Sequence, residues 1–273
     1  MNSFNCVSVP IYELDERGHI KPTPLFHRPF DKLHSRCIEY PFAASRLGDA
    51  KVILDVGTVK SDPAWIAWLE NLPIEVHATD YDTPFKPFKN IKFHQSDIRR
   101  LQLPDDSFDK VIAVSTIEHV GLESPQVLAK ILPCVNTDGD LEAVRELARV
   151  LKPAGELIMT VPFGLPDGLI LGNQARNYTV ESIRKFEKIL DLTHIEYYEY
   201  QSKHLHMKKR QRGIKEEIFE KFVAPLFVDS TTWQDDDVQG EVTWRNIPLE
   251  STGATHKSHL EGVVCSVWKK NIL

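Results

Sequence analysis

The chain has 273 residues, a length at the upper end for a single domain and sufficient for a large core. Its composition, 42% hydrophobic and 26% charged, is that of a soluble globular enzyme, and its net charge of -6 argues against a nucleic-acid partner held by counterion release. The N-terminus has no basic start followed by an apolar stretch, and no apolar run approaches the roughly 18 residues of a membrane span. We therefore expect a cytoplasmic protein with no membrane or nucleic-acid partner.

The cysteines give no sign of a metal centre or a disulfide framework. There are four of them, far apart and without a C-x-x-C pair: Cys6, Cys37, Cys134 and Cys265. His204 and His206 are two residues apart, but no carboxylate lies at a spacing that suits a metal. We expect no bound metal, and the scattered thiols favour a reducing compartment.

Residues 1–48 differ in pattern from the rest of the chain. They hold much of the proline and few long periodic runs, so we interpret them as an N-terminal lead-in that packs on the core. Residues 49–273 form the main domain of this interpretation. Within it, residues 203–250 break the regular rhythm and are expected to be an insertion.

From Lys51 onward, short apolar strands alternate with helices. A strand is predicted in "VILDV" (52–56), followed by a helix in "PAWIAWLENL" (63–72) with Asp62 as N-cap and Pro63 at the first helical position. The next strands are expected at "IEVHATD" (74–80), "IKFHQ" (91–95) and "DKVIAVS" (109–115).

The second half continues the alternation. A helix is predicted over 140–153, ended by Pro153 and Gly155, then a strand over 156–163, a helix over 179–190 capped by Thr179, and strands at 195–200 and 262–270. Such alternation is typical of an α/β fold with a parallel sheet covered by helices on both faces.

One glycine stands alone at the end of the first strand of this sheet. No other glycine lies between Gly48 and Gly121, whereas a dinucleotide requires G-x-G-x-x-G for its pyrophosphate. Asp55, Asp80 and Asp97 close three successive strand regions, which suits a cationic, hydroxyl-rich ligand without pyrophosphate; S-adenosyl-L-methionine is such a ligand. The alternative is that these acids only form turns and caps.

The middle of the chain contains longer motifs. "SDIRRLQLPDDSFDKVIAVSTIEHVG" and "ELARVLKPAGELIMTVPFG" resemble the class I S-adenosylmethionine-dependent methyltransferases, in the branch with F-D-x-V, E-H-V and R-V-L-K-P motifs. The resemblance covers about residues 50–200. It implies a Rossmann-like, doubly wound, mostly parallel seven-stranded sheet with an antiparallel last strand and helices on both faces.

The same resemblance implies a set of cofactor contacts. They would come from Asp55, Val56, Gly57 and Thr58, from Asp80 at the ribose, from Asp97 and Ile98 at the adenine, and from Ser115 beneath the cofactor. The chain departs from the family where Val59 replaces a second glycine and Ala154 replaces the first glycine of a pair. Because Gly155 remains, we expect it to supply the left-handed helix cap.

Candidates for the general base and for contacts with the methyl acceptor lie in the loops that follow the fourth and fifth predicted strands. His119, just past the fourth strand, is the candidate general base for a hydroxyl acceptor, or else organises its loop; Glu118 is expected to be structural. Arg176 and Tyr178, in a loop with three glycines that fits a mobile lid, are candidate substrate contacts. The stretch "CIEYPF" (37–42) resembles members that modify sugars or polysaccharides.

Two segments of the predicted insertion each allow two interpretations. Its basic stretch 202–217 is either a solvated helix face or a clamp for a phosphorylated sugar, and Trp233 and Trp244 close a small satellite core or form a sugar platform.

Three functions are compatible with these features. The first is methyl transfer from S-adenosyl-L-methionine to a small-molecule hydroxyl, on a sugar or specialised metabolite. The second is a non-catalytic scaffold that has lost cofactor binding, and the third, an NAD-dependent oxidoreductase, lacks the required glycines.

Overall fold

The computed structural model describes residues 13–14, 20–21, 35–122, 136–165, 167–170, 173–202, 242–247 and 260–271. The basic stretch predicted as a phosphate clamp and Trp233 lie outside these residues, apart from the backbone of Ser202. Trp244 is described only as part of a strand backbone. The phosphate clamp and the role of the two tryptophans therefore stay predictions. Within the described part, no helix is long and apolar enough to cross a bilayer.

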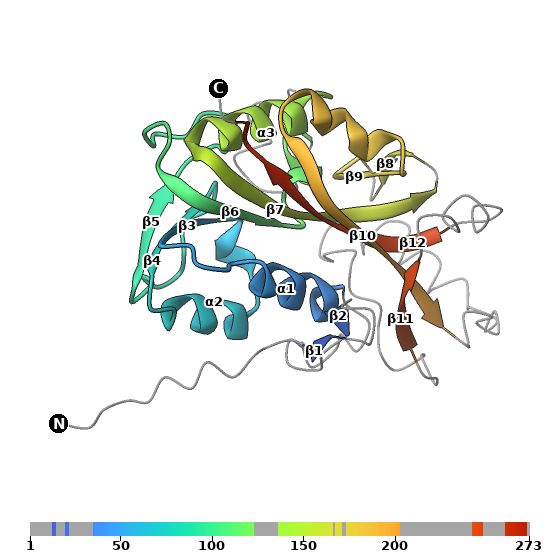
Figure 1. The fold of residues 1–273 in the computed structure, drawn as a ribbon, viewed down its shortest axis with the longest axis horizontal. Helices are drawn as coiled ribbons and strands as arrows, with labels where there is room; N and C mark the ends of the chain where they lie inside the picture. The colour runs from blue at the N-terminus through green and yellow to red at the C-terminus, as the bar shows by residue number, and fades with distance from the viewer. Residues whose placement is uncertain are drawn as a thin grey trace, which may run out of the picture.

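Eight strands form one large sheet in the order β11-β10-β12-β7-β6-β3-β4-β5 (Figure 1). Their bounds are β3 Val52–Val56, β4 Glu75–Asp80, β5 Ile91–Gln95, β6 Phe108–Val114, β7 Leu151–Leu165, β10 Asp191–Ser202, β11 Val242–Ile247 and β12 Leu260–Lys269. The run from β5 to β7 is parallel, and β12 pairs antiparallel with both of its neighbours. This arrangement confirms the predicted Rossmann-like sheet and its antiparallel last strand.

The sheet has one strand more than the seven expected. The additional strand, β11, lies inside the predicted insertion and pairs antiparallel with β10 at the edge of the sheet. Sequence reasoning missed it because an edge strand is defined by its hydrogen-bonding partner, which lies about 45 residues away in sequence.

Helices cover both faces of the sheet, as predicted. Figure 1 shows α1 (Arg36–Ser45) and α2 (Pro63–Glu70) on one side and α3 (Gly139–Val150) on the other. Three short 3-10 helices, η2 (Thr58–Lys60), η3 (Ile117–His119) and η4 (Ser182–Lys188), complete the connections. Two small hairpins pair β1 (Glu13–Leu14) with β2 (Ile20–Lys21) and β8 (Gly168–Ile170) with β9 (Ala175–Asn177).

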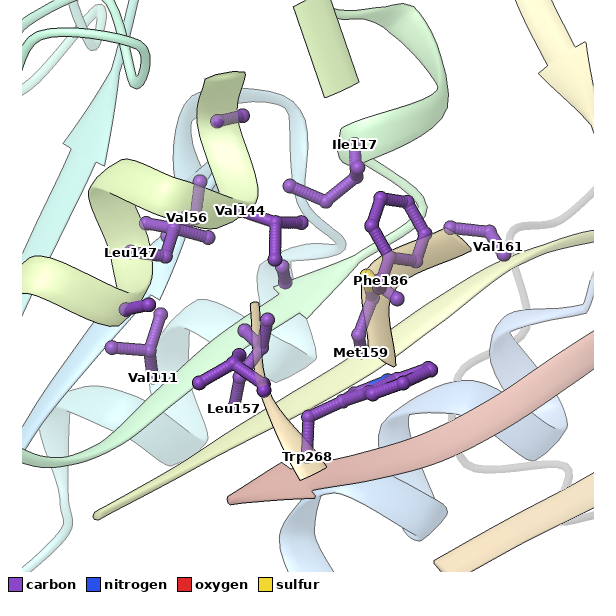
Figure 2. Packing of buried hydrophobic residues seen from close by; sticks show 14 of the residues in the cluster. Val56, Val111, Ile117, Val144, Leu147, Leu157, Met159, Val161, Phe186 and Trp268 are labelled. Carbon is purple, nitrogen blue, oxygen red and sulfur yellow. The ribbon is translucent and has the colours of Figure 1, made fainter. Parts of the chain in front are cut away.

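Alternation along the central strands divides the core into two clusters. Val111 faces the cluster that contains α3 and η4, whereas the next residue, Ile112, faces the cluster that contains α1 and α2. Figure 2 shows the first cluster, where Phe186 of η4 packs edge-on against Trp268 of β12 at 5.9 Å between ring centroids. Burial on both faces explains why these strands read as continuous apolar runs.

The predicted start of α2 is confirmed. The Asp62 carboxylate accepts a hydrogen bond from the Ala64 amide at 2.8 Å, and Pro63 occupies the first helical position, where its missing N–H has no consequence. The predicted cap at Thr179 is wrong, because the N-cap of the helix that forms is Glu181; the Thr179 hydroxyl does accept from the Ser182 amide at 3.2 Å. The element that follows Thr179 is the 3-10 helix η4, however, and begins three residues later than expected.

The predicted cap at Gly155 is wrong. Helix α3 ends at Val150, and the residue with left-handed backbone is Ala154, at φ +63°. Gly155 meets a different demand: a Cβ there would lie 2.9 Å from the Lys152 carbonyl oxygen and 3.1 Å from that of Asp109. The glycine is therefore needed for close backbone approach between β7 and β6.

Helix α1 lies in the region interpreted as a lead-in. Ile38, Tyr40 and Phe42 are buried in the second cluster, so this helix is part of the core of the molecule. Fully burying one such side chain contributes about 1.5–3 kcal/mol. The division of the chain at residue 48, and of an insertion over 203–250, stays a prediction.

Candidate functional site

The carboxyl ends of three neighbouring strands define the candidate site. Strand β3 lies between β4 and β6 and runs parallel to both. The residues at their ends, Asp55, Asp80 and Ser115, are therefore brought to one edge of the sheet, where ligands of open α/β sheets bind.

Gly57 has two reasons to be glycine. Its backbone is left-handed, at φ +81° and ψ +33°, and a Cβ at this position would lie 2.4 Å from the Thr116 hydroxyl oxygen. That hydroxyl donates to the Val56 carbonyl at 3.1 Å and so ties the end of β3 to the end of β6. A single glycine is sufficient because the chain needs left-handed geometry only once before η2 begins.

Val59 is accommodated by the path of this turn. It lies in η2 and is not one of the described residues with positive φ. Its amide donates to the Asp80 carboxylate at 2.8 Å, and the Asp82 amide donates to the other oxygen of Asp80 at 2.9 Å. Burial raises the pKa of Asp80. The second glycine of the family pattern is therefore not required for this loop conformation.

The side chain of Asp55 fixes the loop. It is buried, one oxygen accepts from the Thr58 hydroxyl at 2.6 Å, and the other accepts from the Trp65 indole at 3.2 Å. Burial raises the pKa of Asp55 to about 7. The side chains of Val56 and Thr58 are buried as well. Contacts from this segment to a cofactor would therefore be made by backbone groups.

Asp97 follows β5 and is paired with Arg99. The guanidinium reaches both carboxylate oxygens, with the shortest contact at 2.6 Å, and the Arg99 amide donates to Asp97 at 2.9 Å. Burial opposes the charge of Asp97, but these donors outweigh it and lower its pKa. The Ile98 side chain is buried in the first cluster.

Ser115 connects the site to α1 through Glu39, a residue that sequence reasoning missed. The Ser115 hydroxyl and the Thr160 hydroxyl donate to one oxygen of Glu39, and Ser35 and Arg36 donate to the other. Burial opposes the charge of Glu39, but Arg36 and the hydroxyls outweigh it, so the pKa lies below its usual range. The available signal was an acid inside the apolar stretch "CIEYPF".

His119 presents a half-exposed ring in η3, beyond the end of β6. Its Nδ1 lies 2.7 Å from the Gln174 carbonyl oxygen, and its side chain is 52% exposed. A carbonyl oxygen can only accept, so Nδ1 is assigned the proton and the basic lone pair of the neutral ring lies on Nε2. His119 thus has a defined tautomer whose basic nitrogen can take a proton.

Glu118 is buried beside His119. Its carboxyl is 1% exposed, Oε1 lies 3.8 Å from Nε2 of His119, and Oε2 has no hydrogen-bond partner within the described part of the chain. Burial raises its pKa to about 8. A carboxyl in such surroundings is largely protonated at neutral pH.

Arg176 and Tyr178 point inward. The Arg176 guanidinium donates to the carbonyl oxygens of residues 118, 120, 136 and 137, at 2.7 to 3.2 Å. The Tyr178 hydroxyl donates to the buried Asp140 at 2.7 Å, and both side chains are almost fully buried. This geometry gives them a structural role in holding η3 to α3, and it does not support the predicted contact with substrate.

No group of three or more metal-ligating side chains occurs among the residues that the structure describes.

A family model matches the centre of the chain. Residues 54–159 match a model described as a methyltransferase domain, which extends from within β3 to within β7. Among curated proteins, no relative of the chain was found.

Solved structures are similar in fold at low identity. The Burkholderia thailandensis 1,6-didemethyltoxoflavin-N1-methyltransferase, solved with S-adenosylhomocysteine, gives a TM-score of 0.47 at 12% identity, covering 84% of this chain and 75% of that one. The Haemonchus contortus phosphoethanolamine N-methyltransferase 2, solved with S-adenosyl-L-methionine, gives 0.46 at 15%, covering 84% and 51%. The chain thus spans about half the length of this second protein. The [4+2]-cyclase SpnF gives 0.48 at 14%, covering 85% and 80%.

The match of residues 54–159 falls on the strands that build the candidate site. The last strand, β12, is antiparallel to β7, as the resemblance implied. Residues 54–159 therefore match a methyltransferase domain, and they lie on a Rossmann-like sheet.

Proposed function

We propose that the protein transfers the methyl group of S-adenosyl-L-methionine to a hydroxyl of a small-molecule acceptor, a sugar or another specialised metabolite, with His119 as general base. The observation that carries this proposal is the hydrogen bond from Nδ1 of His119 to the Gln174 carbonyl, which leaves Nε2 basic on a half-exposed ring. A hydroxyl must lose its proton during transfer, so a positioned base supports oxygen as the attacked atom.

The donor set at the strand ends fits this cofactor. Asp80 accepts two backbone amides, and a carboxylate has about four lone-pair sites, so two remain for a pair of ribose hydroxyls. Asp97 and Ile98 are the proposed adenine contacts, Ser115 is proposed to lie beneath the cofactor, and the turn at Gly57 offers backbone groups. When bound, the cofactor supplies a methyl group that its sulfonium has already activated.

The residues of the protein then have to position the acceptor hydroxyl and accept its proton. The acceptor hydroxyl has to be held about 3 Å from the methyl carbon, and water has to be excluded. His119 takes the hydroxyl proton at Nε2, while the Gln174 carbonyl keeps the ring in its orientation. General-base catalysis of this kind contributes about 10²–10⁴-fold in rate.

The choice of a sugar rests on α1. The stretch that resembles sugar-modifying members, residues 37–42, lies in this helix, and its Glu39 reaches Ser115 at the floor of the site. The only support for a phosphorylated sugar is the basic stretch 202–217 of the predicted insertion. Arg176 and Tyr178 are not retained as acceptor contacts.

Calorimetric titration with S-adenosylhomocysteine, followed by an acceptor screen that begins with sugars, tests the proposal. We expect micromolar binding by wild type and by His119→Gln, and methyl transfer that falls at least about 100-fold in His119→Gln. The matched control is His194→Gln, a half-exposed histidine that bonds to Glu196 on β10, and it should retain full activity. Absence of binding at millimolar ligand would instead identify a scaffold that has lost its cofactor.

A further inference from the structure

Two buried glutamates at the site differ in how their oxygens are used. Glu39 has hydrogen-bond donors on both oxygens, as a structural carboxylate should. Glu118 is equally buried, yet its Oε2 has no partner within the described residues. A buried carboxyl oxygen without a hydrogen-bond partner lowers stability. The position therefore calls for a role other than packing.

The other oxygen of Glu118 lies close to the proposed base. Oε1 of Glu118 lies 3.8 Å from Nε2 of His119, which is too long for a hydrogen bond but within the range of an ion pair. Nε2 is the atom that becomes charged when the base takes a proton, because Nδ1 already donates to Gln174. The carboxyl of Glu118 is thus placed at the nitrogen where positive charge develops.

We propose that Glu118 is a positioning residue for His119, neutral while the imidazole is neutral and the counter-ion of the imidazolium once Nε2 has taken the acceptor proton. As Nε2 gains that proton, Glu118 releases its own proton to water, so two neutral groups become an ion pair and one proton leaves for each methyl transferred. After product release, the imidazolium returns a proton to Glu118 through solvent. The catalytic meaning of this coupling rests on the proposed function.

The surroundings of Glu118 permit both states. Among the described residues, the charged and titratable groups that act on Glu118 are Arg36 and Glu39 of α1, His119 of η3, Arg176 of β9, and Tyr178, which follows β9. Arg176 and Tyr178 are in turn paired with Asp140 of α3. Burial and the negative charge of Glu39 favour the protonated carboxyl. The backbone amide of Glu118 itself, Arg36 and the Ser115 hydroxyl favour the ionised one, and the balance places the pKa of Glu118 at about 8. A cation formed 3.8 Å away is sufficient to reverse this balance, since opposite charges at that distance shift a pKa by about 1–3 units.

The test is an NMR titration of the whole protein, with labelled histidine rings and glutamate carboxyls and no ligand present. His119 is assigned by the signal lost in His119→Gln. Groups that interact this strongly titrate in shared steps, so in wild type we expect the His119 and Glu118 signals to follow the same two steps, the upper one at or above about pH 8. Independent single steps for the two residues would overturn the inference.

Two variants sharpen the titration. In Glu118→Gln, which keeps size and shape, we expect a single His119 step whose midpoint lies at least about one pH unit below the upper step of wild type. Glu181→Gln, the same change at an exposed site, should leave the His119 curve unchanged. An unaltered curve in Glu118→Gln would reject the coupling. Because no cofactor or acceptor is added, a negative result in the methyl-transfer assay rejects only the proposed function.

Discussion

The Val59 amide donates a hydrogen bond to the Asp80 carboxylate at 2.8 Å, which ties the turn after β3 to the end of β4. This contact explains how a β-branched residue stands where related sequences have glycine. The turn is held by a neighbouring strand, and its second residue keeps ordinary helical backbone in η2. Asp80 therefore supports the loop as well as being the proposed ribose contact.

Replacing Asp80 should remove both roles at once. In Asp80→Ala we expect the affinity for S-adenosylhomocysteine to fall at least about 100-fold, because hydrogen bonds to a charged group contribute about 1.5–3 kcal/mol each. Isothermal calorimetry measures this change. Asp82→Ala is the matched control, since the half-buried carboxylate of Asp82 forms an ion pair of small energy with Lys60. Equal affinities for wild type and Asp80→Ala would refute the assignment of Asp80.

Gly57→Ala should be more damaging than an ordinary substitution at a left-handed glycine. Gly48 provides the comparison: it also has positive φ, at +56°, but a Cβ there meets nothing within 4 Å. We expect Gly48→Ala to lower the free energy of unfolding by about 1–2 kcal/mol, through backbone strain alone. Gly57→Ala adds the 2.4 Å approach to Thr116 and should lose clearly more, together with cofactor binding. Urea unfolding of the two variants decides the matter, and equal losses would show that the Thr116 contact relaxes freely.

The pair at positions 154 and 155 should respond in opposite directions. Ala154 holds left-handed backbone at φ +63°, so Ala154→Gly relieves strain and should raise the free energy of unfolding by about 1 kcal/mol. Gly155→Ala places a Cβ against three backbone oxygens and should lower it. Chemical denaturation with both variants measures the two changes. A loss of stability in Ala154→Gly would contradict the strain argument.

Asp55 should make the protein less stable as the pH rises. Its pKa in the folded state is raised, mainly by burial, to about 7, above the value of about 3.9 in an unfolded chain. The folded state thus holds the proton more tightly, and this contribution is complete below about pH 4 and is lost as the pH approaches 7. Its upper limit is about 4 kcal/mol.

Urea unfolding between pH 5 and pH 8 tests this linkage. In Asp55→Asn, which keeps the size of the side chain and its hydrogen-bonding capacity toward Trp65, the decline of stability with pH should be shallower than in wild type. Parallel curves for the two proteins would show that Asp55 does not titrate in this range.

Several elements of the fold were predictable because their signals are local. The cap at Asp62 with Pro63 and the buried strand 52–56 each depend on residues close in sequence, and the structure confirms them. The alternation of strand and helix likewise predicts a covered parallel sheet. Helix α1 was missed because its residues 37–43 are buried without interruption, Glu39 included, and because Pro41 lies inside it, so no exposed polar face or uninterrupted helix-forming sequence marks it.

The sequence by itself determined the strand ends and their chemistry: a lone glycine, acids that close successive strands, and a histidine after the fourth. Only the tertiary structure decided what each group does, because the decisive contacts join residues distant in the chain. Glu39 reaches Ser115 across 76 positions and His119 reaches Gln174 across 55. Both Glu39 and Glu118 are buried, but only Glu118 has an oxygen, Oε2, without a hydrogen-bond partner among the described residues; this difference arises from the assembled sheet and its helices.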